Sequence, residues 1–206
     1  MKVIIYLSEG MQVVASVVAL IFFMPIILII SLLIKLDSSG NIFFRQKRVG
    51  RNGSRFTLYK FRTFKENTKT LEASPTSLDD TRLSRVGKFL RKYSLDELPQ
   101  LLNVIKRDIN IVGPRAIVFE ALMERVSYLI DKDSDKEEEY RFLYLSKRQM
   151  VRPGITGLAQ ISGRSTISVE DSLRYDMEYI DNRSLFLDLK IIFKTFHTVF
   201  FGKDYN

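Results

Sequence analysis

The chain contains no cysteine, and His197 is its only histidine. Without cysteine there is no disulfide framework, no thiol nucleophile and no thiolate ligand for zinc. A single histidine also leaves little with which to build a Ser-His catalytic pair. Any chemistry must therefore rest on carboxylates, arginines, lysines and hydroxyl groups.

Charge is missing from one long stretch, the 22 residues 13–34. A helix of about 20 apolar residues is long enough to cross a hydrocarbon core of roughly 30 Å. Pro25, in the middle of the stretch, removes a backbone donor and crowds the carbonyl four residues earlier, so the helix should bend or break there. Two topologies compete: a kinked span, or a re-entrant helix that enters and leaves by the same face.

Two other interpretations of this stretch are weaker. A signal peptide has an apolar region of about 7–15 residues followed by a small-residue cleavage site. This stretch is longer and continues directly into Lys35. A buried core helix would seldom extend this far without a charge, so membrane insertion is the favoured prediction.

The chain is basic, with 32 Lys and Arg against 24 Asp and Glu and a formal net charge of +8. Much of the excess lies close behind the apolar stretch. These basic residues are Lys35, Arg45, Lys47, Arg48, Arg51, Arg55, Lys60 and Arg62. Such a cluster marks the cytoplasmic side of a membrane segment, and each cation near anionic headgroups contributes about 1 kcal/mol.

The patterns predict a membrane helix over residues 1–36 and one globular domain over 37–206. Strands are predicted at 42–46 and 55–61, around a Gly-Arg-Asn-Gly turn, which makes a short β-hairpin. The predicted helical segments are 86–92, 99–106, 115–130, 169–180 and 185–201. The polar stretch 63–80 is predicted to be a loop or short helix, and the charge cluster 131–139 a solvated connection or helix start. The fold class is therefore α+β and predominantly helical.

The last helical segment, 185–201, has a broad apolar face with lysines nearby. It is either an amphipathic helix lying in the membrane interface or an ordinary core helix. The sequence favours neither.

Candidate chemistry begins with two adjacent carboxylates, Asp96 and Glu97, that shortly precede Pro99. Proline is common at the first helical position, so the carboxylates should lie at a helix entry, where backbone donors stabilise anions, including phosphate. A carboxylate can act as a covalent nucleophile on phosphorus when cations offset the repulsion. The competing interpretation is a capping box formed by Ser94 and Glu97, which is commoner.

Two further motifs suggest anion binding. Gly113-Pro114 predicts a turn that presents Arg115, whose guanidinium can hold two phosphate oxygens. The glycine-rich stretch 152–164 carries Arg152, Thr156, Gln160 and Arg164, which could hydrogen-bond or pair with a phosphorylated ligand. It does not match a Walker loop.

Five ordered motifs together resemble those of the bacterial sugar transferases, the monotopic phosphoglycosyl transferases. They are FRQKRVG at 44–50, YKFRT at 59–63, SLDELPQL at 94–101, VGPR at 112–115 and RPGITGLAQ at 152–160. The resemblance covers nearly the whole chain and reverses the local preference for a capping box.

The resemblance implies transfer of a phosphosugar from a UDP-sugar to undecaprenyl phosphate, with release of UMP. Asp96 would be the nucleophile and Glu97 its partner, both near a required Mg²⁺. Arg115 would bind donor phosphate, Lys60 and Arg62 would line the basic approach, and Asp176 would match a functional acidic position.

The resemblance also implies a re-entrant anchor with both ends cytoplasmic, at the bacterial inner membrane, in the minimal catalytic form of the family. Expected partners are the UDP-sugar, the polyprenol phosphate and membrane lipid, but no nucleic acid. Downstream glycosyltransferases or a second copy of the chain are open as further partners. The alternative function is a non-enzymatic, membrane-tethered protein that binds nucleic acid or anionic lipid through its basic segment.

Overall fold

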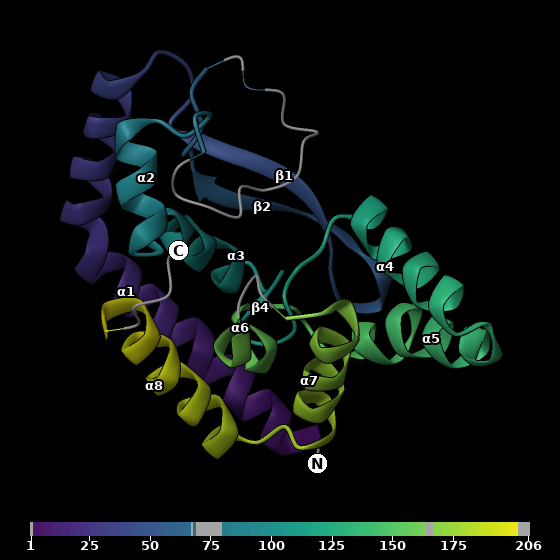
Figure 1. Ribbon diagram of the computed structural model, residues 1–206. Coiled ribbons are helices and arrows are strands. Elements are labelled where there is room, and N and C mark those ends of the chain that lie inside the picture. The colour runs from purple at the N-terminus through teal and green to yellow at the C-terminus, as the bar shows by residue number, and fades with distance from the viewer. Residues whose placement is uncertain (1, 67, 69–79, 164–166, 202–206) are drawn as a thin grey trace.

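In the computed structural model the described residues are 2–66, 68, 80–163 and 167–201. Helices predominate, and two small two-stranded sheets lie among them (Figure 1). The predicted class, α+β with mostly helix, is confirmed.

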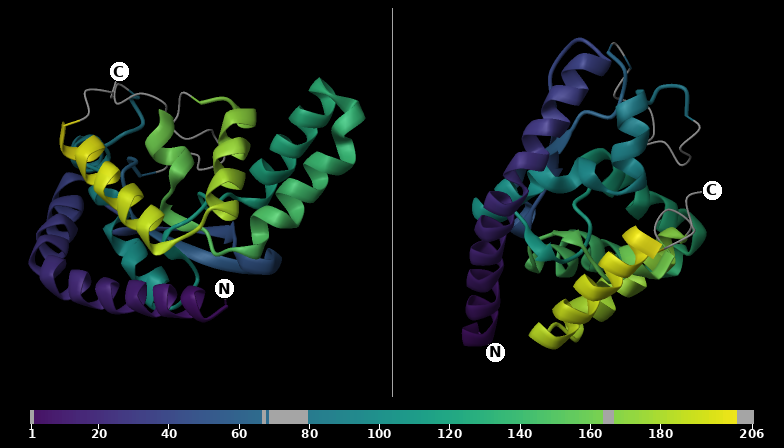
Figure 2. Two further views of the ribbon diagram at one scale, coloured as in Figure 1. Left: turned by 90° about the horizontal axis from the view of Figure 1, so that it is seen from below. Right: turned by 90° about the vertical axis from the view of Figure 1, so that its left-hand side faces the viewer.

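Helix α1 extends from Lys2 to Asp37 and contains Pro25. Its helical assignment continues through the proline, and Figure 2 shows the helix strongly bent between its purple and its bluer half. The part Glu9–Asp37 is long and apolar enough to cross a membrane, and only 11% of its most apolar window is buried in the protein. The exposed apolar side chains include Val14, Val18, Ile21, Phe22, Leu28, Ile29, Leu32 and Leu36. A core helix would be covered, so this one is not a core helix.

Pro25 divides α1 into an N-terminal and a C-terminal arm. The C-terminal arm packs against the globular part. Ile30 and Ile34 are buried in one cluster with Phe61 and Leu90. The arm therefore has one face in the domain and one face open.

The N-terminal arm is attached by polar contacts instead. Gln12 Oε1 accepts a hydrogen bond from the backbone of Ile111 at 2.6 Å. Glu9 forms an ion pair with Arg152. Both arms of the bent helix thus contact the same domain.

The predicted hairpin is confirmed, with a longer first strand. Strand β1, Phe43–Val49, pairs antiparallel with β2, Arg55–Phe61. The turn between them is a short 3₁₀ stretch, η1 (Arg51–Gly53), in which Asn52 has φ 54° and Gly53 has φ 73°. The left-handed backbone at these residues suits asparagine and glycine.

The edge of β2 that does not pair with β1 is hydrogen-bonded by the side chain of Asn103. Asn103 Nδ2 donates to the Thr57 carbonyl at 2.7 Å, and Asn103 Oδ1 accepts from the Tyr59 amide at 3.1 Å. The amide thereby satisfies edge groups that a neighbouring strand would otherwise bond.

A second sheet, which the sequence patterns do not predict, joins β3 (Asn110–Val112) and β4 (Gly154–Thr156) in parallel. The glycines around it permit very close packing. A Cβ on Gly154 would lie 2.1 Å from the Gly113 nitrogen, and one on Gly157 would lie 2.2 Å from the Gly113 oxygen. These glycines therefore bring two backbone segments together, rather than bringing backbone to a ligand.

The remaining helical elements include the five predicted segments, with shifted boundaries, and others that the patterns do not predict, such as Lys147–Met150 and Leu158–Gly163. They are α2 (Arg85–Lys92), η2 (Leu95–Gln100), α3 (Leu101–Ile105), α4 (Phe119–Lys132), η3 (Ser134–Lys136), α5 (Glu137–Leu145), η4 (Lys147–Met150), α6 (Leu158–Gly163), α7 (Val169–Asp181) and α8 (Leu185–Phe201). Helix α4 starts later than predicted because Val118 is extended. The charge cluster contains the start of α5, and α4 and α5 project together from the body (Figure 1).

The core consists of several small clusters rather than one large one. In the largest, Leu122 and Val126 of α4 pack with Tyr144 of α5 and Met177 of α7. A second cluster lies against the hairpin; its buried members are Phe56, Leu58, Val104, Ile109 and Ala116. This cluster supports the segments that carry the candidate site.

Helix α8 buries Ile191 completely but leaves other apolar residues exposed, with Phe186 at 80% and Phe193 at 74%. In Figure 1 it lies in front of the middle of α1. Because Phe186 and Phe193 are largely exposed, the core-helix interpretation accounts for only one face of α8.

Candidate active site

Asp96 and Glu97 lie in η2, directly before α3. Pro99 is inside this 3₁₀ segment, so the prediction that it opens the following helix is wrong in position. Ser94 has φ 53° and makes no capping hydrogen bond through its side chain. The capping-box interpretation is therefore wrong, and the chain enters η2 through a left-handed turn at Ser94.

Both carboxylates converge on one lysine from the hairpin. Lys60 Nζ lies 2.6 Å from Glu97 Oε1 and 3.7 Å from Asp96 Oδ2. All three side chains are largely buried, with Lys60 17%, Asp96 9% and Glu97 20% exposed. The predicted dyad and the predicted basic residue of β2 are thus brought together.

Burial raises the pKa of the Asp96 carboxyl above its ordinary value, against the opposing charge of Lys60, and the Glu97 charge raises it further. Burial would also raise the pKa of Glu97, but Lys60 and Arg115 outweigh it, and that pKa lies below its ordinary value. The two carboxyls therefore differ: Glu97 is held as an anion, whereas Asp96 is the one whose ionisation depends on its surroundings.

Two more cations act on the pair. The positive charges of Arg91 and Arg115 both lower the pKa of Asp96 and of Glu97. Arg91 belongs to α2, and its Nε donates to Thr63 Oγ1 at 3.1 Å. Burial lowers the pKa of Arg91, as expected for a cation held among others.

Arg48, on β1, is a further cation near the pair. Its Nη1 donates to the Ala116 carbonyl at 2.9 Å and its Nη2 donates to Gln46 Oε1 at 2.5 Å. Burial, together with the charge of Arg115, lowers the pKa of Arg48 to about 10, although Glu97 opposes this. The site thus has more positive than negative charge, which favours a multiply charged anion such as a diphosphate.

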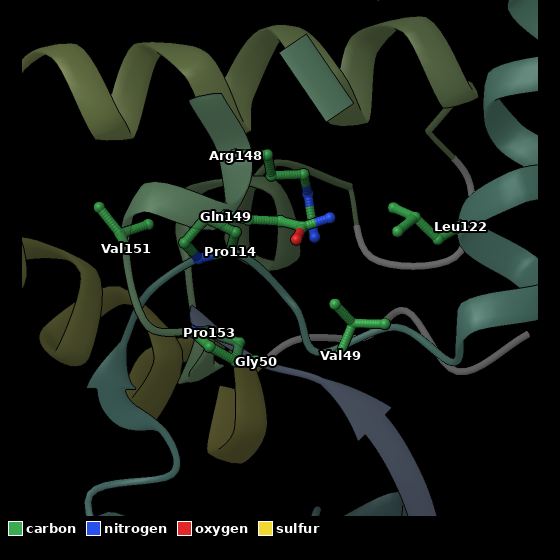
Figure 3. A pocket seen from close by; sticks show the side chains of 8 residues that line it. All are labelled: Val49, Gly50, Pro114, Leu122, Arg148, Gln149, Val151 and Pro153. Carbon is green, nitrogen blue, oxygen red and sulfur yellow. The ribbon is translucent and has the colours of Figure 1, made fainter. Parts of the chain in front are cut away.

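Arg115 is exposed, but its backbone carbonyl is bonded by a buried side chain. Its carbonyl accepts a hydrogen bond from Arg148 Nη2 at 2.7 Å. Arg148 Nε in turn donates to Asp176 Oδ2 at 2.8 Å. Figure 3 shows the Arg148 side chain between Pro114 and Leu122. The predicted site residue Asp176 is therefore buried, and Arg148 links it to Arg115; burial raises the pKa of Asp176 against the charge of Arg148.

The dyad has the donor chemistry for Mg²⁺. Magnesium is commonly bound by one or two carboxylates, with substrate phosphates and water supplying the other oxygens. Lys60 Nζ lies close to Glu97 Oε1, at 2.6 Å, but 3.7 Å from the nearer oxygen of Asp96. No group of three or more His, Cys, Asp and Glu forms among the described residues. The residues present fit a metal shared with a phosphorylated substrate.

Other predicted site residues have different contacts. Arg62 is bonded to the turn after α1, where its Nη2 donates to the Ser38 carbonyl at 2.8 Å. Arg152 pairs with Glu9, at the opposite end of α1. Among the residues that the structure describes, neither forms a hydrogen bond or ion pair with the dyad.

Of the remaining predicted residues, Thr156 lies on β4 and Gln160 on α6. Thr156 Oγ1 shares a hydrogen bond with Thr195 Oγ1 of α8 at 2.7 Å. Both polar atoms of the Gln160 amide are buried without a hydrogen bond in the described part of the structure. Arg164 lies outside the described residues.

Sequence reasoning missed Arg91, Arg148 and Arg48 as members or supports of this site. Arg48 and Arg91 occur within segments that were recognised, the first motif and the amphipathic stretch 86–92. Arg148 had no such signal, because its role depends on α7 and the 113–115 turn meeting in space.

A carboxylate pair surrounded by cations, beside an exposed apolar helix, has the charge to hold a phosphorylated ligand. A model of the family described as bacterial sugar transferase matches residues 5–202, and the chain belongs to this family.

Three relatives show the breadth of the similarity. The UDP-N-acetylgalactosamine-undecaprenyl-phosphate N-acetylgalactosaminephosphotransferase of Aeromonas hydrophila is 37% identical over 200 residues, which cover 96% of this chain and 44% of the relative. The exopolysaccharide production protein ExoY of Rhizobium meliloti is 38% identical over 207 residues, covering 93% and 84%. The UDP-glucose:undecaprenyl-phosphate glucose-1-phosphate transferase of Klebsiella pneumoniae is 40% identical over 202 residues, covering 93% and 40%. The chain therefore spans less than half of the Aeromonas and Klebsiella relatives and most of ExoY.

Proposed function

We propose that this protein transfers a phosphosugar from a UDP-sugar to undecaprenyl phosphate, releases UMP, and thereby starts the assembly of a surface glycan. The observation that carries the proposal is the contact of Lys60 with both Asp96 and Glu97, inside a group of arginines. The names of the Aeromonas and Klebsiella relatives supply the acceptor, undecaprenyl phosphate, and the reaction class.

In the first step, an oxygen of the Asp96 carboxylate attacks the sugar-linked phosphorus of the donor. The bond from that phosphorus to the bridging oxygen breaks, and UMP leaves with this oxygen and its electron pair. Asp96 then carries the phosphosugar as an acyl phosphate. Lys60, Arg91 and Arg115 stabilise the negative charge that develops on the diphosphate.

In the second step, a phosphate oxygen of the polyprenol phosphate attacks the same phosphorus. The bond to Asp96 breaks, the carboxylate is regenerated, and the product is a polyprenol diphosphate sugar. Because UMP has left before the lipid enters, one small site serves both substrates in turn.

Mg²⁺, held by Asp96, Glu97 and the donor phosphates, would supply charge neutralisation at the diphosphate. Glu97, whose pKa is lowered, provides a permanent anion for that purpose. Lys60 bridges the dyad and keeps the two carboxylates in one orientation.

The contacts of α1 support a re-entrant anchor. Near its N-terminal end Glu9 pairs with Arg152, and at its C-terminal end Asp37 Oδ2 accepts from the Val86 amide at 3.1 Å. A straight span would place these ends on opposite sides of the bilayer, yet both contact one domain. The bend of α1 and the basic residues behind it support our proposal that the domain lies on the cytoplasmic face of the inner membrane. The exposed phenylalanines of α8 would lie in the interface.

The test is UMP release by full-length protein in detergent, with Mg²⁺, undecaprenyl phosphate and a panel of UDP-sugars. One donor should give UMP and a lipid-linked product, and Asp96→Asn should abolish both. Normal turnover by Asp96→Asn would overturn the assignment of the nucleophile. If no donor reacts while the protein binds anionic vesicles in a salt-dependent way, the non-enzymatic alternative is correct.

A further inference from the structure

A second group of cations lies at the other end of the hairpin from the dyad. A cavity of about 410 Å³ there is lined by Arg51, Arg55, Arg107 and Arg152, with Asp108 as its only acidic residue. Arg55 and Lys60 occupy opposite ends of β2, five residues and about 17 Å apart. One phosphate group cannot reach both, so a phosphate in this cavity is not one that Lys60 holds at the dyad.

The arginines of the cavity are poorly balanced by acids. Within the described part of the chain, Arg51 and Arg107 take part in no ion pair. Arg55 lies over the Phe119 ring, 5.1 Å from its centroid. Like charges gathered around a cavity repel one another, and an anion that enters it relieves this repulsion.

The carboxylates nearby do not cancel the excess. One oxygen of Asp108 already accepts a hydrogen bond from Asn103 Nδ2 at 2.9 Å. Glu9 forms an ion pair with Arg152. Four guanidinium groups thus stand against two carboxylates, one of which, Glu9, is paired with Arg152, and an excess of two positive charges is left.

The backbone at the cavity is also unusual. Among the described residues, only Asn52, Ser94 and Arg107 have positive φ without being glycine, and two of these line the cavity. Arg107 has φ 61° just after α3, a position where glycine is usual. Left-handed backbone costs an arginine about 1 kcal/mol, and such costs concentrate at functional sites.

We propose that this cavity is a second anion site and that it binds a phosphate group, supplied by the headgroup of an anionic lipid. Guanidinium groups match phosphate oxygens in planar pairs of hydrogen bonds. Arg152 ties the cavity to Glu9, where the apolar segment of α1 begins, so the cavity opens at headgroup height in the proposed topology. The inference rests on the proposed membrane placement of α1 and does not depend on the chemistry of the dyad.

The test measures binding to full-length protein in a neutral detergent by titration calorimetry. One arm uses dihexanoyl-phosphatidylglycerol, a second uses inorganic phosphate, and a third uses dihexanoyl-phosphatidylcholine. We expect saturable binding of phosphatidylglycerol that is at least tenfold tighter than that of the other two ligands. The double variant Arg51→Gln, Arg107→Gln should weaken it at least tenfold.

The matched control is Arg141→Gln with Arg174→Gln, which removes the same charge from exposed surface pairs on α5 and α7. It should bind like the wild type. Arg107→Gly relieves the left-handed strain, so it should fold at least as well as the wild type and still bind several-fold more weakly. Asp96→Asn should bind normally, which separates this site from the proposed activity.

Equal binding of phosphatidylglycerol by the wild type and the cavity variant would overturn the site, as would an equal loss in the control pair. If inorganic phosphate binds as tightly as the lipid and is lost in the same variants, the cavity is a phosphate site for a soluble ligand, and the lipid assignment is wrong.

Discussion

Arg148 and Asp176 form a buried ion pair, with Arg148 Nε donating to Asp176 Oδ2 at 2.8 Å. The same guanidinium holds the carbonyl of Arg115 at 2.7 Å. An arginine of the candidate active site is thus fixed through its backbone by a pair inside the core. We therefore expect Asp176, which is buried, to act on the site through Arg148 rather than by touching a substrate.

Replacing Asp176 by Asn should destabilise the fold. The change leaves the charge of Arg148 buried without a counter-charge, which costs about 3 kcal/mol. Adding Arg148→Met in the same chain should restore much of the lost stability, because the buried charge is then removed. Denaturant unfolding of the detergent-solubilised protein measures both effects.

The control for this prediction lies on the same helix. Asp171 pairs with Arg174 at the surface, so Asp171→Asn should change the free energy of unfolding by no more than about 0.5 kcal/mol. Equal stability of the Asp176→Asn and Asp171→Asn variants would show that the buried pair has no such role.

Lys60→Met should move the acid limb of the activity profile to higher pH. The nucleophile acts as a carboxylate, so the rate falls as pH drops through the pKa of Asp96. Burial already raises that pKa, and Lys60 opposes the rise. Without the lysine the protonated form persists to higher pH, and kcat/KM for UMP release is lost over a wider acidic range.

The measurement is kcat/KM against pH at a fixed, saturating Mg²⁺ concentration. Lys106→Met is the matched control, because Lys106 is exposed and bonds to Tyr59 away from the dyad. Its acid limb should coincide with that of the wild type. If the acid limb of the Lys60→Met profile falls at the same pH as that of the wild type, the proposed electrostatic role of Lys60 is contradicted.

Gly154→Ala should disrupt the packing under the Arg115 turn. A Cβ at Gly154 would lie 2.1 Å from the Gly113 nitrogen, and backbone cannot move aside as a flexible side chain can. We expect a loss of about 3 kcal/mol in the free energy of unfolding, together with reduced activity. Gly10→Ala is the control, since a Cβ there meets nothing within 4 Å and alanine favours helix by up to about 1 kcal/mol. Similar stability of the two variants would refute the close-packing argument.

The elements that local pattern defines were predictable. The hairpin has β-rich segments around a glycine turn, and α7 and α8 have clear apolar faces, so their positions agree within a few residues. The pairing of β3 with β4 was not predictable, because each strand has three residues and the partner lies more than forty residues away. A strand of three residues is too short to show an alternation of apolar and polar residues, and its sequence does not indicate a distant partner.

The same division applies to the candidate site. Asp96, Glu97 and Lys60 occur in motifs, and the structure brings them together. Arg62 and Arg152 also occur in motifs, but their contacts are with Ser38 and Glu9 instead. A basic residue in a motif indicates only that a positive charge is needed, and the packing of α1 decides which anion or carbonyl it meets.

The topology of α1 can be tested with single cysteines, because the chain has none of its own. Gly10 and Ser39 are exposed near the two ends of the apolar segment, and Phe22 is 73% exposed within it. In a re-entrant anchor, Gly10→Cys and Ser39→Cys should both react with a charged maleimide in inside-out vesicles and neither should react in intact spheroplasts. Phe22→Cys should be protected in both and react only after detergent is added. Reaction of Gly10→Cys in intact spheroplasts would instead establish a span, and the Glu9 to Arg152 ion pair could not then form in the membrane.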